Sequence, residues 1–284
     1  MEITSEMIKK LRDKTGAGMM DCKRALESTG GDMEAAIEYL RKKGAAVAQK
    51  RADRAAKEGI IVTRVSPDGK LGVVVEVNCE TDFVGRSDDF TGFAQGVAEA
   101  IEKQKPGSLE VALELKTSSG KKIVDLLNDL LSKVGEKIDV RRFAMYESGN
   151  GVTSSYTHLG SKIGVLVEIE GEGDQRALGT LGRDIAMQVA AMNPQYISRD
   201  QVSKDVVDRE LDIYRTHAKN EGKPEQVLDK IATGRLEKFY QEVCLMEQTF
   251  IKDPGKTIKE HLQSVGKNLK IKRFQRYHLG EETK

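Results

Sequence analysis

The chain has 284 residues, and its 46 Lys plus Arg nearly balance its 45 Asp plus Glu, which leaves a net charge of +1. This balance excludes binding of nucleic acid through a bulk positive field, because proteins of that class carry a large basic surplus. Aromatic residues make up only 5% of the chain and tryptophan is absent, so stacking platforms for single-stranded nucleic acid would be hard to build.

Residues 1–44 are predicted to form three short helices, because their apolar residues recur at helical spacing. The first helix ends at Thr15-Gly16-Ala17-Gly18, and the second runs from about Met20 to Ser28. Asp32 is placed to cap the third helix, which is predicted to end at Gly44. A three-helix unit of this size is near the lower limit for independent stability.

Residues 45–57 are rich in alanine, basic, and free of glycine and proline, which is typical of a helical linker. Between Arg41 and Lys57 there are seven basic residues and one acidic residue. Two interpretations stay open for this segment: a solvated basic face, or a docking surface for an acidic partner.

Residues 58–148 are predicted to form a first core subdomain. Two apolar runs, 59–65 and 71–77, flank the turn Pro67-Asp68-Gly69 and predict a β-hairpin. The next elements expected are a helix between Asp88 and Pro106, a helix over 123–134 and a strand over 138–143.

The second half of the chain repeats the first. Residues 162–169 match 70–77 at an offset of 92, and residues 262–274 match 131–143 at an offset of 131. These two collinear matches predict an α+β fold made of two duplicated subdomains with antiparallel sheets. The second subdomain comprises 149–200 and 244–276.

The difference between the two offsets predicts an insertion of about 39 residues, placed at 201–243. It contains two charged helical stretches, 202–220 and 225–243, separated by Gly222-Lys223-Pro224. Their apolar stripes are narrow, which favours a projecting antiparallel coiled-coil hairpin that contacts a partner or forms a homodimer with a second copy of the chain. Residues 277–284 are interpreted as a C-terminal tail.

Motifs for catalysis, metals and nucleotides are missing. The run before Gly255-Lys256-Thr257 has Phe250 where a phosphate-binding loop needs glycine, and the four histidines are scattered. Three widely spaced cysteines without a Cys-x-x-Cys pair predict reduced thiols rather than disulfides or a zinc site. With no membrane span and no signal peptide apparent, we expect a cytoplasmic, non-enzymatic protein that needs no cofactor and binds neither nucleotide, nucleic acid nor membrane directly.

One loop distinguishes the two copies. After its second strand, copy one places Phe83 where copy two has Gln175. The module therefore does not require an aromatic residue here, and two interpretations stay open: a satellite core residue, or an exposed side chain that inserts into a partner. An enzyme built on Cys79, Asp82 and His158 is a further hypothesis, although these residues follow no known catalytic spacing.

Two long motifs, 15–23 (TGAGMMDCK) and 77–84 (VNCETDFV), closely resemble the bacterial elongation factor Ts family. The runs 160–167 and 134–138 are also similar to that family, and the resemblance covers essentially the whole chain. It implies a guanine-nucleotide exchange factor for elongation factor Tu, with a ubiquitin-associated-like N-terminal module. The alternative is an RNA-binding translation accessory protein that uses the basic segments 41–57 and 267–276.

The resemblance also implies the contact residues. Thr81, Asp82, Phe83 and Val84 would reach the Mg²⁺ site of the GTPase, with the phenylalanine as the intruding side chain. Arg12, Met19 and Met20 of the N-terminal module would grip a helix of the same GTPase domain. The second subdomain would bind elsewhere on elongation factor Tu, with His158 as its candidate contact.

Overall fold

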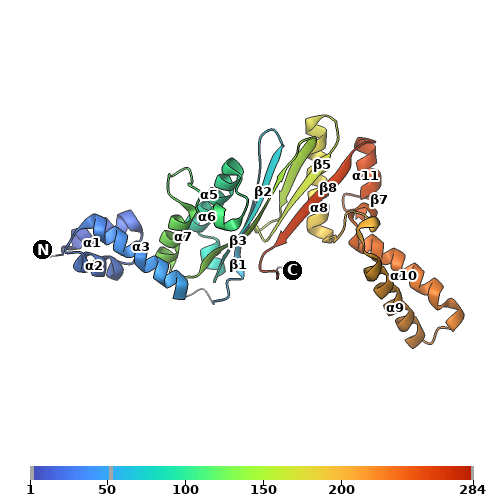
Figure 1. The fold of residues 1–284 in the computed structure, drawn as a ribbon, viewed down its shortest axis with the longest axis horizontal. Helices are drawn as coiled ribbons and strands as arrows, with labels where there is room; N and C mark the ends of the chain where they lie inside the picture. Colours follow the sequence, from blue (N-terminus) through green and yellow to red (C-terminus); the bar gives the residue numbers. More distant parts are fainter. Residues whose placement is uncertain (1–2, 51–53, 283–284) are drawn as a thin grey trace.

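Two three-stranded antiparallel sheets form the centre of the molecule, in a computed structural model that describes residues 3–50 and 54–282 (Figure 1). The first sheet has the order β1 (Glu58–Val65), β2 (Leu71–Cys79), β3 (Ile138–Glu147), and the second has the order β4 (Gly151–Thr157), β5 (Ile163–Glu170), β8 (Lys270–His278). The predicted α+β class with antiparallel sheets is confirmed.

Helices cover the outer side of each sheet, and the remaining elements extend the molecule at both ends (Figure 1). The N-terminal helices are α1 (Ser5–Thr15), α2 (Met19–Ser28) and α3 (Met33–Lys50). The first sheet is accompanied by α4 (Asp82–Gly85), α5 (Asp88–Gln104), α6 (Leu109–Leu113) and α7 (Ile123–Val134). The second is accompanied by α8 (Gln175–Met192), β6 (Thr249–Phe250), β7 (Asp253–Thr257) and α11 (Ile258–Val265). Between α8 and β6, the helices α9 (Lys204–Asn220) and α10 (Leu228–Val243) lie side by side and project from the body (Figure 1). Short 3₁₀ turns at Arg199–Gln201, Glu225–Val227 and Leu245–Glu247 flank these two helices.

The central strands β2 and β5 are covered on both faces, which explains their nearly continuous apolar sequences. In β2, Val73, Val75 and Val77 pack in the cluster shared with α5 and α7, whereas Val74 packs toward the second sheet. The first sheet therefore packs against helices on one face and against the other sheet on its opposite face.

Glycine allows the two sheets to approach closely at two matching positions. A Cβ atom on Gly72 would lie 2.4 Å from a methyl carbon of Thr153, and one on Gly164 would lie 2.4 Å from a methyl carbon of Ile61. Both distances are shorter than any real Cβ contact, so a larger residue would push the sheets apart. The two glycines are 92 residues apart, as in the repeat.

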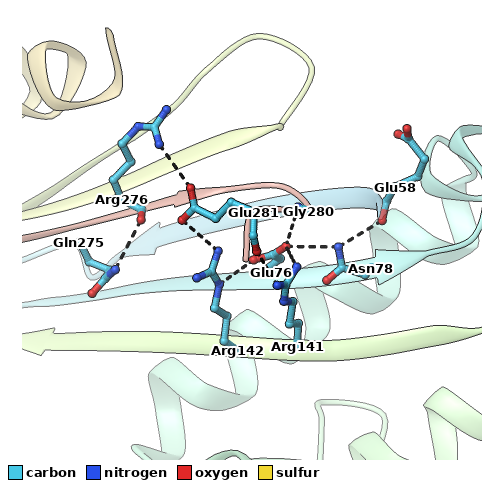
Figure 2. Close-up of polar contacts among 9 residues, drawn as sticks. All are labelled: Glu58, Glu76, Asn78, Arg141, Arg142, Gln275, Arg276, Gly280 and Glu281. Atoms are coloured by element: carbon cyan, nitrogen blue, oxygen red, sulfur yellow. Dashed lines mark hydrogen bonds and ion pairs between the residues drawn. The ribbon is translucent and has the colours of Figure 1, made fainter. Parts of the chain in front are cut away.

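A fully buried carboxylate ties the C-terminal residues to the first sheet (Figure 2). Glu76 accepts from the Nε atom of Arg142 at 2.7 Å and from an Nη atom of Arg141 at 3.4 Å. The backbone N–H of Gly280 donates to the same carboxylate at 3.1 Å, and Glu281 lies 3.3 Å from Arg142. The buried charge is thus surrounded by donors from two distant parts of the chain.

The second sheet contains the corresponding arrangement. Glu168 is 1% exposed and accepts from the Nε atom of Arg273 at 2.6 Å. Each of the two arginines then stacks on a tyrosine of the opposite sheet: Arg142 lies 4.1 Å from the ring centre of Tyr277, and Arg273 lies 4.1 Å from that of Tyr146. These reciprocal cation–π contacts join the two sheets.

The third helix does not end at Gly44, as the sequence predicted, but continues to Lys50. Gly44 is needed for a contact instead, because a Cβ atom there would lie 2.1 Å from the hydroxyl oxygen of Ser132 on α7. The predicted helical linker 45–57 is therefore wrong in part: its beginning belongs to α3, and residues 54–57 are not helical. Residues 51–53 lie outside the described residues.

The predicted C-terminal tail 277–284 begins too early. Tyr277 is paired with Gly164 in β8, and Leu279 is buried in the cluster between the sheets. Residues 283–284 lie outside the described part of the chain. Within the described ranges, no helix is both long enough and apolar enough to cross a membrane.

Candidate protein-interaction site

The turn after β2 presents an aromatic side chain to solvent. Residues Asp82–Gly85 form the one-turn helix α4, and Thr81 caps it by accepting from the N–H of Val84 at 3.5 Å. Phe83 lies on this turn and is 84% exposed. Phe83 is therefore not a satellite core residue, which was one of the two interpretations that the sequence left open.

The turn rests on the ends of β1 and β2. The thiol of Cys79 lies 3.0 Å from the carbonyl oxygen of Thr81 and donates to it. Gly85 is buried against Gly59 and Cys79, where a Cβ atom would still fit at 3.4 Å. Asp82 forms an exposed ion pair with Arg86 at 2.9 Å. The base of the turn is thus buried, whereas its tip is free to contact another molecule.

The segment between α7 and β3 holds the same turn from the other side. Glu136 accepts from both the N–H and the hydroxyl group of Thr81, at 3.1 Å and 2.9 Å. Glu80 accepts from the backbone N–H of Lys137 at 2.7 Å and pairs with Arg54 at 3.2 Å. A role for Glu136 was not predictable from the sequence, because its partner lies 55 residues away.

The corresponding turn of the second sheet is built differently. Asp174 caps α8 by accepting from the N–H of Ala177 at 2.9 Å, and Gln175 is already the first residue of that long helix. A separate one-turn helix like α4 is therefore absent from this turn, all of which the structure describes. The exposed aromatic residue and the short helix that contains it therefore occur in the first copy and not at the corresponding turn of the second.

The three other candidate residues lie on the N-terminal helices α1 and α2. Arg12 is exposed on α1, and Met19 and Met20 begin α2 with exposed fractions of 59% and 64%. The helices dock on α7 through α3, and Lys133 of α7 packs against Gly16. Two adjacent exposed methionines are an apolar surface that suits a protein partner.

His158 lies in the turn between β4 and β5, in the second sheet. Its Nδ1 atom is 3.0 Å from the hydroxyl group of Tyr156. The neighbouring Leu159 is 90% exposed, and among the large apolar side chains of the described residues it is the most exposed. Leu159 was not predicted from the sequence; the available signal was an apolar residue in a polar turn, outside any helical stripe of apolar residues.

The β4–β5 turn also lies against β1. The N–H of Ile61 donates to the carbonyl oxygen of Ser161 at 2.7 Å, and Lys162 pairs with Glu58 at 3.4 Å. Because the turn of Phe83 rests on Gly59, the turns of Phe83 and Leu159 contact the same half of β1; these are the two most exposed of the large apolar side chains that the structure describes.

The enzyme hypothesis based on Cys79, Asp82 and His158 is not supported. Cys79 is fully buried, and burial first, followed by the nearby carboxylates of Glu136 and Glu58, raises the pKa of its thiol to about 12. A thiol that is buried, protonated and engaged with a carbonyl group cannot act as a nucleophile at neutral pH.

The basic segment 267–276 is partly neutralised within the molecule. Lys272 and Arg273 both pair with the buried Glu168, at 3.0 Å and 2.6 Å, and Arg276 lies 3.6 Å from Glu281. These pairings weaken the case for a continuous RNA-binding surface here. The other basic segment includes residues that lie outside the described ranges.

Comparison with known proteins gives one consistent result. The family model described as "Elongation factor TS" matches residues 80–281. A protein named "Elongation factor Ts" from Prosthecochloris aestuarii is 47% identical over 98% of this chain and 99% of its own length. Proteins of the same name from Chloroherpeton thalassium and Clostridium perfringens are 45% and 44% identical, over 99% and 98% of this chain and 99% and 93% of their own lengths.

Proposed function

The chain belongs to the elongation factor Ts family, and we propose on that basis that it is the guanine-nucleotide exchange factor for elongation factor Tu in translation elongation. The observation that supports this most directly is Phe83, an aromatic side chain that is 84% exposed on a turn with a buried base. An exposed aromatic residue on a well-held support is typical of an anchor at a protein–protein interface.

The proposed mechanism acts through binding alone and needs no covalent step. In a P-loop GTPase, Mg²⁺ bridges the nucleotide phosphates and protein groups, and it therefore contributes strongly to nucleotide affinity. The turn of Thr81, Asp82, Phe83 and Val84 would insert near this Mg²⁺ site and disturb its surroundings. Since linkage is reciprocal, GDP and the exchange factor weaken each other's binding by the same factor, and GDP is released from the ternary complex.

Further contacts with elongation factor Tu would orient the turn that contains Phe83. We infer that Met19, Met20 and Arg12 bind the GTPase domain from the N-terminal module. His158, together with Leu159, would bind a second site on elongation factor Tu. Several separate contacts increase affinity through effective concentration without requiring one large interface.

We also infer the finer architecture from the repeat and from the matched contacts. The two sheets share the strand order, the position of a register shift after a glutamate, and the buried Glu76 and Glu168, which supports their origin as two copies of one module. The pair α9–α10 fits an antiparallel coiled-coil arm inserted into the second copy. A homodimer through this arm stays a prediction, which sedimentation of the purified chain would test.

The test of the proposed function is release of fluorescently labelled GDP from elongation factor Tu. The wild-type chain should accelerate release, and Phe83→Ala should reduce the acceleration roughly 30-fold, as loss of an interface anchor does. Because Phe83 is exposed, the melting temperature should stay nearly unchanged.

The matched control is Gln175→Ala, which changes the corresponding residue of the second copy. It should leave exchange at the wild-type rate. A wild-type chain that does not accelerate GDP release would contradict the proposed function, and binding to RNA with a steep salt dependence would favour the alternative.

A further inference from the structure

We propose that Glu136 is a positioning residue for nucleotide exchange: its carboxylate fixes the turn that presents Phe83. This inference rests on the proposed function, because it assigns Glu136 a role in the same interaction. Glu136 is half-buried between α7 and β3, behind the turn rather than at its exposed tip.

The geometry shows how Glu136 acts on the turn. One carboxylate accepts both donors of Thr81: the N–H at 3.1 Å, and the hydroxyl group at 2.9 Å to one oxygen and 3.0 Å to the other. With its proton directed to Glu136, the Thr81 hydroxyl oxygen has its lone pairs available for the N–H of Val84. The carboxylate thereby orients the cap of the helix that contains Phe83.

Such support is needed because α4 has only four residues. A helix of one turn is not stable by itself, since nucleation costs more than its few hydrogen bonds return. The turn of Phe83 therefore depends on its surroundings for a single conformation, and charge-assisted hydrogen bonds are the strongest of those that hold it.

The second copy of the module serves as an internal comparison. We call the hydrogen bonds between Glu136 and Thr81 the clamp. At the repeat offsets, Thr81 corresponds to Gly173 and Glu136 corresponds to Lys267, so neither partner of the clamp is present in the second copy. That copy has Gln175 where the first has Phe83, and its helix is capped by Asp174 instead. The module folds without the clamp, so the clamp accompanies the exposed aromatic residue rather than the fold.

The consequence for exchange follows from populations. When a binding-competent conformation is only partly populated, the apparent affinity falls by that fraction. Without Glu136, the N–H and hydroxyl of Thr81 would compete for other acceptors, and Phe83 would sample several positions. We expect Glu136→Gln to slow GDP release roughly tenfold, because the amide keeps one acceptor oxygen but loses the negative charge that strengthens the hydrogen bonds to both Thr81 donors.

The experiment compares Glu136→Gln with Glu260→Gln. Glu260 is the matched control because it also accepts from the N–H and hydroxyl of a helix-capping threonine, Thr257, at 2.8 Å and 3.0 Å, but in α11 of the second copy. Labelled-GDP release from elongation factor Tu is measured against concentration for both variants. Glu136→Gln should lower exchange, whereas Glu260→Gln should not.

Two readouts separate positioning from simple stabilisation. First, Glu136→Gln should cause no further loss of exchange activity in a Phe83→Ala background, because the turn then has no aromatic side chain to position. Second, amide hydrogen exchange of the free protein should become at least about fivefold faster at residues 81–86 in Glu136→Gln, with an unchanged melting temperature.

The outcomes are distinguishable. If the wild-type chain accelerates GDP release from elongation factor Tu and Glu136→Gln accelerates it equally, the positioning role is rejected while the proposed function stands. An equal loss in the Phe83→Ala background, or a lowered melting temperature that accounts for the effect, also overturns it. If the wild-type chain does not accelerate GDP release from elongation factor Tu, both proposals fail, whatever the rates of amide hydrogen exchange are.

Discussion

Cys79 lies under the turn of Phe83, where its thiol contacts the carbonyl oxygen of Thr81. Burial, with a smaller contribution from Glu136 and Glu58, raises the pKa of this thiol from 9.0 to about 12. The folded protein therefore keeps its proton at a pH where the unfolded chain releases it. Cys79 thus supports the turn as a small neutral donor, not as a reactive group.

This pKa predicts how stability depends on alkaline pH. The contribution of Cys79 is fully present below pH 9 and is lost as pH rises from about 9 to about 12, because the unfolded state then binds fewer protons than the native state. Cys79→Ala should therefore reduce the alkaline slope of the free energy of unfolding by up to one proton, about 1.4 kcal/mol per pH unit. Urea unfolding between pH 8 and pH 11 measures this slope.

Labelling provides the control for the cysteine prediction. All three cysteines, Cys22, Cys79 and Cys244, are buried and raised in pKa by burial, that of Cys244 to about 11. The folded chain should consequently react slowly with a thiol reagent at pH 8, and unfolding in urea should expose all of them. Rapid labelling of Cys79 in the folded chain would contradict its assignment as a buried donor.

At the scale of elements, the helix α3 shows where local sequence signals stop being sufficient. Glycine after a run of helical residues usually marks an end, yet α3 passes through Gly44 and docks on α7. The glycine is required by Ser132 and by the carbonyl oxygen of Asn128, which a Cβ atom would meet at 2.1 Å and 3.1 Å.

Gly44→Ala should accordingly weaken the docking of the N-terminal helices. The gain in helix propensity, about 1 kcal/mol, is opposed by an overpacking cost of about 1–3 kcal/mol at the contact with α7. We expect faster hydrogen exchange in α3 and α7 and a lower free energy of unfolding. Adding Ser132→Ala removes the nearest atom and should restore most of the loss; no restoration would contradict this contact as the cause.

The sequence predicted several elements well because their signals are local. The hairpin of β1 and β2 follows from two apolar runs around a Pro-Asp-Gly turn, and α5 follows from its periodicity up to Pro106. Residue pairs far apart in the chain were not predictable. The hydrogen bonds of Glu136 with Thr81 and of Gly280 with Glu76 depend on how the elements pack, and the sequence does not show which partner each residue meets.

The candidate site was predictable in part for the same reason. Comparison of the two copies singled out Phe83, but it could not decide between core and surface, because exposure depends on the elements around the turn. Leu159 was missed because a single apolar residue in a turn is common on protein surfaces.

At the scale of the whole molecule, each sheet contains one buried carboxylate, and the two carboxylates differ in their surroundings. The side chains of Arg141 and Arg142 beside Glu76 are only 25% and 17% exposed. Those of Lys272 and Arg273 beside Glu168 are 45% and 44% exposed, so water can solvate them if their partner is lost.

Removal of the two carboxylates should therefore have unequal effects. Glu76→Ala removes the buried carboxylate that two poorly solvated guanidinium groups share and should cost about 3–5 kcal/mol of folding free energy. Glu168→Ala should cost less, about 1–3 kcal/mol, because its partners can turn to solvent. Urea titrations of both variants test this order, and a larger loss for Glu168→Ala would contradict it.

The position of β8 has a consequence for synthesis of the chain. Glu168 in β5 and Lys272 in β8 are 104 residues apart, whereas β1, β2 and β3 all precede β4. On the ribosome, the first sheet can form while the second still lacks its third strand. One edge of β5 therefore stays unpaired while the α9–α10 arm is translated. The nascent chain would thus expose an incomplete sheet with an unpaired apolar strand for several seconds, and during this interval a chaperone has a substrate to recognise.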